Sequence, residues 1–315
     1  MKKTCSFFLI LLSLLIWAQQ DIPIAFYGQN LQFFNPAATG LEDQVVMSSI
    51  LRSQWSGIKG APDIQLFKLS IPEGEKRLGY GAILMVDQTF VERQTNIFAN
   101  FSYRLPLGNG NSLFLGVQAG GNHVSMDFSG INMTHDDDDK LVSLTRFYPN
   151  IGVGVHYKMD KGYLSFSAPI MMGHLKDKNA DAVNPSPVDD LHLYFSGGGL
   201  RLPAFAPNWR YIVSCFVRWV KSAPISSVIN AGFTYQKSEF LFAYHHNSSM
   251  GLSAFFDNGG PISVGYAHQF PTPDLISKLG FRNHELIIRI RLNNKKGEGK
   301  ELDTDETSED NLDMN

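Results

Sequence analysis

One short segment of the chain combines residue types found in hydrolytic sites. Residues 245–249 read His-His-Asn-Ser-Ser, and serine, histidine and asparagine are the groups that a membrane esterase uses. Neighbouring residues on a strand point to opposite faces, so His245 and His246 cannot join one site. A triad is defined by geometry, which the sequence does not supply. Asp189 and Asp190 match a barrel protease only in composition. We therefore expect no catalytic residues and no cofactor.

A run of four carboxylates offers oxygen ligands of the kind that Ca²⁺ binds. The run consists of Asp136, Asp137, Asp138 and Asp139. It lacks the glycine and the closing glutamate of an EF-hand loop. We therefore expect a solvated loop at this position and no metal site.

The composition narrows the class of protein. The 315-residue chain has a net charge of −3, which gives no indication of nucleic-acid binding. Charged residues make up 18% of the chain, below the roughly 25% of an average soluble domain. Aromatic residues make up 12%. Few charges and many aromatic residues suit a membrane barrel with aromatic girdles, but they also suit a β-rich secreted domain.

The N-terminus has the pattern of an export signal. Lys2 and Lys3 precede a nearly continuous apolar stretch over residues 7–16, and polar residues follow Ala18. We expect a secretory signal peptide over residues 1–18, removed after Ala18. A membrane anchor is the alternative, but the apolar stretch is shorter than a spanning helix requires. Cys215 is then the one cysteine of the mature chain, so no intrachain disulfide can form.

The strongest structural signal is apolar and polar residues alternating with a period of two. In the last such segment, Leu286, Ile288 and Ile290 alternate with Arg289 and Arg291. In an exported chain, this pattern predicts an all-β fold, an antiparallel transmembrane β-barrel of the outer-membrane type. About fourteen segments show the alternation: 44–55, 61–71, 78–88, 93–104, 111–125, 146–158, 161–168, 190–202, 209–220, 227–236, 238–246, 249–257, 260–268 and 282–292.

The connections between these segments support the barrel. The three longest expected connections are residues 126–145, 169–189 and 269–281, and all follow odd-numbered segments. Outer-membrane barrels have short periplasmic turns and longer outer loops, so the long connections should lie outside the cell. The expected organisation is a signal peptide (1–18), an N-terminal periplasmic segment (19–43), a barrel (44–292) and a disordered acidic tail (293–315).

Four short motifs carry a resemblance to a known family. Residues 35–40 read Asn-Pro-Ala-Ala-Thr-Gly, which would open a turn before the first strand. Residues 52–62 match the pattern R-x-Q-W-x-G-x-x-G-A-P. Residues 152–157 read Gly-Val-Gly-Val-His-Tyr, and residues 284–285 read His-Glu. With these motifs in this order, the chain resembles the PorP/SprF family of the Bacteroidetes.

The resemblance covers about residues 22–292. It implies an integral outer-membrane protein of the type IX secretion and gliding-motility machinery. It also implies a non-enzymatic barrel that works with periplasmic ring and peptidoglycan-binding components, and that helps to export or anchor a large secreted adhesin. The residues leave open an alternative, a passive channel or porin.

Five residues of the second motif are the candidate partner-binding residues. Arg52 and Gln54 would project into the lumen near its outer end, where they could bind a partner peptide or tie down a plug. Trp55 would lie at the outer membrane interface, and Gly57 and Pro62 would shape the first outer turn. The alternative is that all five only build the barrel rim.

The arginines of the predicted strands should face the lumen, because an arginine on the lipid face costs about 2–4 kcal/mol at the membrane midplane. They would give the barrel a basic lumen, suited either to a peptide or to passing anions. These arginines are Arg52, Arg104, Arg218, Arg289 and Arg291.

Overall fold

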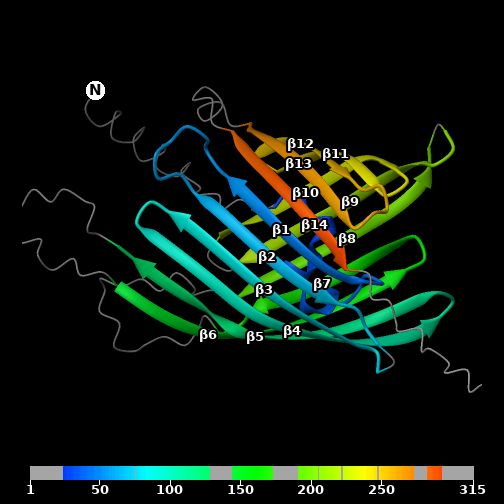
Figure 1. The fold of residues 1–315 in the computed structure, drawn as a ribbon, viewed down its shortest axis with the longest axis horizontal. Helices are drawn as coiled ribbons and strands as arrows, with labels where there is room; N and C mark the ends of the chain where they lie inside the picture. The colour runs from blue at the N-terminus through cyan, green and yellow to red at the C-terminus, as the bar shows by residue number, and fades with distance from the viewer. Residues whose placement is uncertain are drawn as a thin grey trace, which may run out of the picture.

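The chain folds into a closed antiparallel barrel. The computed structural model describes residues 24–74, 76–127, 144–172, 191–204, 206–220, 223–246, 248–272 and 282–292. Each strand in this described part pairs with the next along the chain, and the last strand pairs with the first (Figure 1). The strands are β1 Val45–Ser53, β2 Asp63–Ile71, β3 Leu78–Thr89, β4 Glu92–Gly108, β5 Asn111–Met126, β6 Leu144–Met159, β7 Gly162–Ile170, β8 His192–Pro203, β9 Trp209–Val220, β10 Ala223–Tyr235, β11 Ser238–His245, β12 Ser249–Phe256, β13 Ile262–Pro271 and β14 Asn283–Leu292.

These fourteen strands confirm the predicted fold class. Each predicted segment overlaps one strand in the same order. No helix in the described ranges is long and apolar enough to cross a membrane. The signal-peptide prediction (1–18) and the tail prediction (293–315) fall outside the described residues.

The alternation along each strand separates an outer face from an inner face. In β4, Ile97 and Phe101 are exposed on the outside, whereas Asn96 and Asn100 are buried on the inside. Phe98 breaks the pattern, since it is apolar and yet buried on the inner face. A barrel surface of this kind matches the lipid phase with apolar side chains and keeps polar groups inside.

The two ends of the barrel differ in their connections. At one end, the short-turn end, the connections are 72–77, 109–110, 160–161, 204–208, 236–237 and 257–261. At the other, the long-loop end, they are 54–62, 90–91, 127–143, 171–191, 221–222, 246–248 and 272–282. The three longest connections lie at the long-loop end as predicted, although three short ones lie there too. Since periplasmic turns are short in outer-membrane barrels, we assign the long-loop end to the cell surface.

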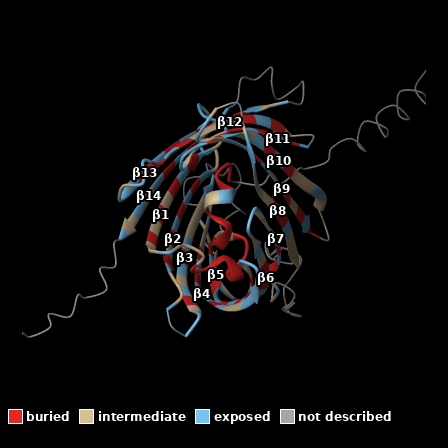
Figure 2. Ribbon diagram, turned by 90° about the vertical axis from the view of Figure 1, so that its right-hand side faces the viewer, coloured by how far each residue is buried: buried red, intermediate tan, exposed pale blue. Residues whose placement is uncertain are grey.

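The residues before β1 correct one prediction. The sequence places residues 19–43 in the periplasm, outside the barrel. In the structure, the described part of this stretch lies inside the lumen and is mostly buried (Figure 2). We call residues 24–42 the luminal segment. It contains three short 3-10 helices, η1 Tyr27–Gln29, η2 Leu31–Phe33 and η3 Pro36–Ala38.

The inner wall explains why this segment is inside. Several inward positions of the strands are apolar, among them Ile50, Phe216 and Phe255, and they form one buried cluster with Phe26 and Phe34 of the luminal segment. Apolar groups on the wall of an empty lumen would face water. Burying a large apolar side chain contributes about 1.5–3 kcal/mol, so the segment and the wall stabilise each other.

Candidate functional site

The luminal segment packs on the wall through a group of aromatic rings. The ring centroids of Phe34 and Phe216 are 4.7 Å apart, and those of Tyr27 and Phe216 are 5.2 Å apart. The hydroxyl of Tyr27 donates a hydrogen bond of 2.7 Å to Ser214 Oγ. Burial raises the pKa of Tyr27 well above its ordinary value, so this hydroxyl remains protonated and able to donate.

A buried carboxylate holds the start of the segment near the long-loop end. The side chain of Glu285 accepts hydrogen bonds from the backbone N–H groups of Ala25, at 2.8 Å, and Phe26, at 3.1 Å. Arg52, the directly paired residue on β1, lies 3.3 Å from the same carboxylate. Both charged side chains are almost fully buried. A buried carboxylate requires such partners, because an uncompensated buried charge is strongly destabilising.

The Asn-Pro-Ala-Ala-Thr-Gly motif forms the second attachment. The side chain of Asn35 caps η3 by accepting from Ala37 N at 2.8 Å. Its amide also donates to Val155 O at 2.9 Å and to Ser165 Oγ at 2.6 Å, on β6 and β7. The motif therefore does more than open a turn, since one side chain both organises the segment and fastens it to the wall.

Two glycines make room for this motif. A Cβ atom at Gly116 of β5 would lie 2.1 Å from Ala37 N, and one at Gly154 of β6 would lie 1.9 Å from Asn35 Oδ1. Real Cβ atoms do not approach other atoms so closely, so any larger residue would push the segment off the wall. Gly154 belongs to the third sequence motif, residues 152–157. The third motif therefore forms part of the wall surface on which the first motif packs.

An ion cluster holds the end of the segment at the short-turn end. Glu42 lies 3.3 Å from Lys68 Nζ and 2.7 Å from Arg289 Nη2, and it accepts a hydrogen bond of 3.1 Å from Ser70. Burial by itself would raise the pKa of Glu42, but the positive charges of Lys68 and Arg289 outweigh burial and hold the pKa below its ordinary value. Glu42 is therefore ionised at neutral pH.

The remaining arginines correct the expectation of a basic lumen. Arg104 pairs with Glu73, and Arg291 pairs with Asp257. Arg52 and Arg289 also have carboxylate partners, Glu285 and Glu42. The sequence could not show these pairs, because the partners come from distant segments. The paired charges remove the argument for a simple anion path.

The five candidate partner-binding residues divide into two groups. Arg52 points into the barrel and lies 3.3 Å from Glu285, the residue that accepts hydrogen bonds from the start of the luminal segment. The other four lie in the 54–62 connection at the long-loop end. Gln54 N donates to Pro62 O at 2.9 Å, and Trp55 N donates to Asn283 Oδ1 at 3.1 Å.

The 54–62 connection is shaped by its backbone. Trp55 and Gly57 both have positive φ angles, of 47° and 101°. Trp55 is 44% exposed, so it is available at the barrel mouth. Partner binding by Arg52 or by these four residues remains a prediction.

The other chemical clusters give no site in the described residues. His245 is buried inside the barrel, 3.1 Å from Gln269 Nε2, whereas His246 is exposed in the following turn. Asn247, Asp189, Asp190 and the run from Asp136 to Asp139 fall outside the described residues. Within the described ranges, no group of three or more His, Cys, Asp or Glu side chains could hold a metal ion.

A closed β-barrel with an apolar outer face and a polar, partly filled interior defines the class as integral outer-membrane proteins. Residues 16–290 match the family described as "Type IX secretion system membrane protein PorP/SprF", so the chain belongs to this family. The match confirms the resemblance drawn from the four motifs. The fold and the family also support a location in the outer membrane.

Solved outer-membrane barrels show distant likeness. The Acinetobacter baumannii protein Omp33 has a TM-score of 0.44 and 8% identity, over 81% of this chain and 100% of that chain. A Pseudomonas aeruginosa FadL homologue has a TM-score of 0.43 and 13% identity, over 83% and 93%. The KdgM porin has a TM-score of 0.36 and 8% identity, over 79% and 100%. Likeness at this level carries no functional information. No curated protein matches the chain.

Proposed function

We propose that this barrel is a binding component of the type IX secretion and gliding machinery. Its long-loop end and luminal rim hold a secreted surface protein and help to export or anchor it. Its short turns contact the periplasmic ring and peptidoglycan-binding components. The family description supports the assignment to the machinery. The mechanism is binding, with no chemical step.

The observation that carries this proposal is the luminal segment, which fills part of the barrel interior. Three of the sequence motifs meet at the luminal segment: Asn35 belongs to it, Gly154 lies under it, and Glu285 holds its start. A barrel that uses its motifs to keep its own chain inside is better suited to binding a partner at its ends than to passing solutes. The alternative, a passive channel, requires an open path past this segment.

Trp55 gives the proposed cargo surface an identifiable contact. Exposed tryptophans often dominate the energy of protein interfaces, because they offer a large apolar area with few rotatable bonds. Trp55 is anchored through its backbone to Asn283, and the adjacent Ser56 N donates to Arg282 O at 3.0 Å. The 54–62 connection is therefore held against β14 and presents its indole from a fixed backbone.

The test is affinity purification of a tagged chain from native membranes in mild detergent, followed by mass spectrometry. We expect recovery of periplasmic ring proteins and of one large secreted protein. Trp55→Ala should reduce the recovered secreted protein and leave the ring proteins in place. Leu107→Ala is the matched control, since Leu107 is an exposed apolar side chain near the opposite end.

Recovery of the barrel alone, or only with copies of itself, would argue against the proposal. Single-channel recording in planar bilayers then decides for the alternative. A steady, open, anion-selective conductance of the unmodified protein would favour the passive channel.

A further inference from the structure

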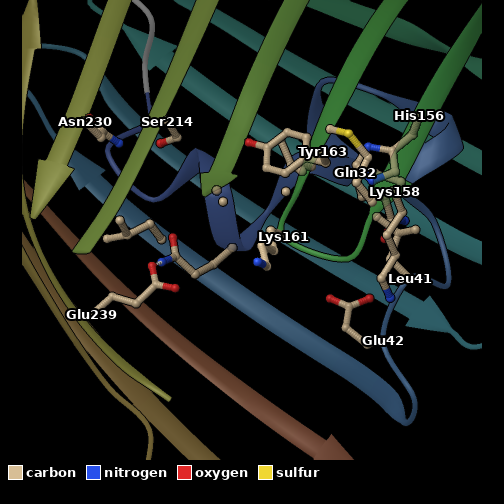
Figure 3. Close-up of a pocket in the computed structure, with 18 of the residues that line it drawn as sticks. Gln32, Leu41, Glu42, His156, Lys158, Lys161, Tyr163, Ser214, Asn230 and Glu239 are labelled. Carbon is tan, nitrogen blue, oxygen red and sulfur yellow. Dashed lines mark hydrogen bonds between the residues drawn. The ribbon is translucent and has the colours of Figure 1, made fainter. Parts of the chain in front are cut away.

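A second feature of the lumen is a cavity between the luminal segment and the short-turn end. Its volume is about 630 Å³. Its lining includes Gln29 and Gln32 of the luminal segment, the β6–β7 turn and the start of β11, and Figure 3 shows Gln32, Lys161 and Glu239 around it. The cavity is distinct from the space that Gly116 and Gly154 leave on the wall, because η3 fills that space. A volume of this size is in the range of pockets that bind small ligands or short peptides.

Three buried polar atoms on the cavity wall have no hydrogen-bond partner among the described residues. They are Gln32 Oε1, Asn230 Oδ1 and His156 Nδ1. All three side chains line the cavity and belong to residues that are at most 3% exposed. A buried polar group without a partner costs about 1–3 kcal/mol. Gln32 Oε1 and Asn230 Oδ1 can accept from an occupant only once their side chains turn toward the cavity, because both atoms are themselves buried, and His156 Nδ1 donates or accepts according to its tautomer.

The charges around the cavity are of both signs. Lys158 and Lys161 are exposed on the rim, and the described residues include no ion pair to either. Three carboxylates also line the cavity: Glu42, Glu239, which accepts from Gln29, and Asp160, which is exposed between the two lysines. Backbone N–H groups would suit the unpaired acceptors, and side chains of both charges would suit this rim. The chemistry thus fits a mixed-charge peptide.

We propose that the occupant is the chain's own C-terminal tail, residues 293–315. β14 ends at Leu292, only three residues after Arg289, which lines the cavity. The tail therefore starts at the short-turn end, beside the cavity. Its 23 residues can extend over roughly 75 Å, so reach is no obstacle.

The tail also has the required charges. It begins with three lysines, Lys295, Lys296 and Lys300, and carries eight acidic residues between Glu298 and Asp313. The lysines complement Glu239, and the acidic residues complement Lys158 and Lys161. A segment too polar to fold alone can still bind in extended form. Docking of the tail does not depend on the proposed cargo function.

The test is a cysteine cross-link in the full-length barrel with Cys215→Ala as background. One variant combines Lys161→Cys on the rim with Ser308→Cys in the tail. The matched control combines Lys76→Cys with Ser308→Cys, because Lys76 is an exposed lysine at the same end that does not line the cavity. Heat-modifiable gel migration verifies that each barrel is folded.

We expect the Lys161→Cys pair to cross-link within one chain at least about tenfold faster than the Lys76→Cys pair. Adding Lys158→Glu should slow this cross-link several-fold. Equal rates for the two pairs, or a rate unaffected by Lys158→Glu, would overturn the proposal. So would cross-links that join two chains, or that join the thiol introduced on the rim to a co-purified periplasmic protein, since the occupant would then be another polypeptide.

Discussion

Two attachments of the luminal segment, at its start and at η3, hold it to the barrel by different physical means. Near the long-loop end, the start of the segment depends on charge, through Glu285 and its partner Arg52. Toward the short-turn end, η3 depends on shape, because Gly116 and Gly154 leave just enough space for Ala37 and Asn35. The comparison shows that one segment can be fixed both by an electrostatic attachment and by a steric fit.

These two attachments should respond to different changes. The charged attachment at Glu285 should be sensitive to removal of a charge and insensitive to added volume elsewhere. The glycine-lined attachment at η3 should be sensitive to a single methyl group. Variants at each attachment, ordered from the largest expected effect to the smallest, test whether this division holds.

The largest effect is expected from Glu285→Ala. This change removes two hydrogen bonds to the segment and leaves Arg52 as a buried charge without its carboxylate. Breaking a buried pair in this way costs about 3–5 kcal/mol. Denaturant unfolding in detergent, followed by tryptophan fluorescence, measures the loss. The double variant Arg52→Leu with Glu285→Leu should lose less, because no lone charge remains. A single variant as stable as the parent would contradict the charge-based attachment.

A smaller loss is expected from Gly116→Ala. The new methyl group would meet the backbone at Ala37, which cannot move without lifting η3 from the wall. Overpacking of this kind costs about 1–3 kcal/mol. Gly197→Ala in β8 is the control, because the nearest atom to its new Cβ would be the end of the flexible Leu164 side chain, at 3.1 Å, and the nearest backbone atom would lie at an ordinary 3.6 Å. Equal unfolding midpoints for the two variants would show that shape does not fix η3 to the wall.

Asn35→Ala should cost about 1–2 kcal/mol, since it removes the cap of η3 and the donors to Val155 and Ser165. Asn35→Asp separates these roles, because a carboxylate can still accept from Ala37 N but cannot donate to the wall. We expect Asn35→Asp to destabilise the barrel as well. If it unfolds like the parent, the cap matters and the wall contacts do not.

The ion cluster at Glu42 gives a pH dependence. Its pKa in the folded barrel is below the ordinary value, so the cluster contributes stability that is fully present above the unfolded pKa of roughly 4.3. That contribution is lost as the pH falls through the lower, folded pKa. Unfolding measured from pH 7 to pH 3 should show this loss, and Glu42→Gln should flatten it. A curve of the same steepness in the variant would exclude Glu42 as the cause.

The smallest effect is expected at the exposed pair of Arg104 and Glu73. The Arg104 side chain is 41% exposed, so solvent screens the interaction. Glu73→Gln should change the free energy of unfolding by about 0.2–1 kcal/mol. Thermal unfolding of the two proteins side by side measures this difference. A loss as large as that of Glu285→Ala would show that burial does not separate the two ion pairs.

The barrel wall was predictable because its signal is local. The pattern within one strand indicates which of its faces meets lipid, without knowledge of the partner strand. In β4, for example, apolar Ile97 and Phe101 alternate with polar Asn96 and Asn100. The luminal segment has no such signal, since its three 3-10 helices are too short to show a period. Its apolar residues, such as Phe26 and Phe34, were the available hint that it is buried.

The sequence by itself determined the class of fold, the inward direction of Arg52 and the family, because periodicity and short motifs are properties of neighbouring residues. Only the tertiary structure decided what Arg52 meets, since Glu285 is 233 residues away and becomes adjacent when β14 closes the barrel on β1. The luminal position of residues 24–42 was decided in the same way. The glycines and apolar residues that contact this segment form one surface only after strands from distant parts of the chain have come together in the barrel.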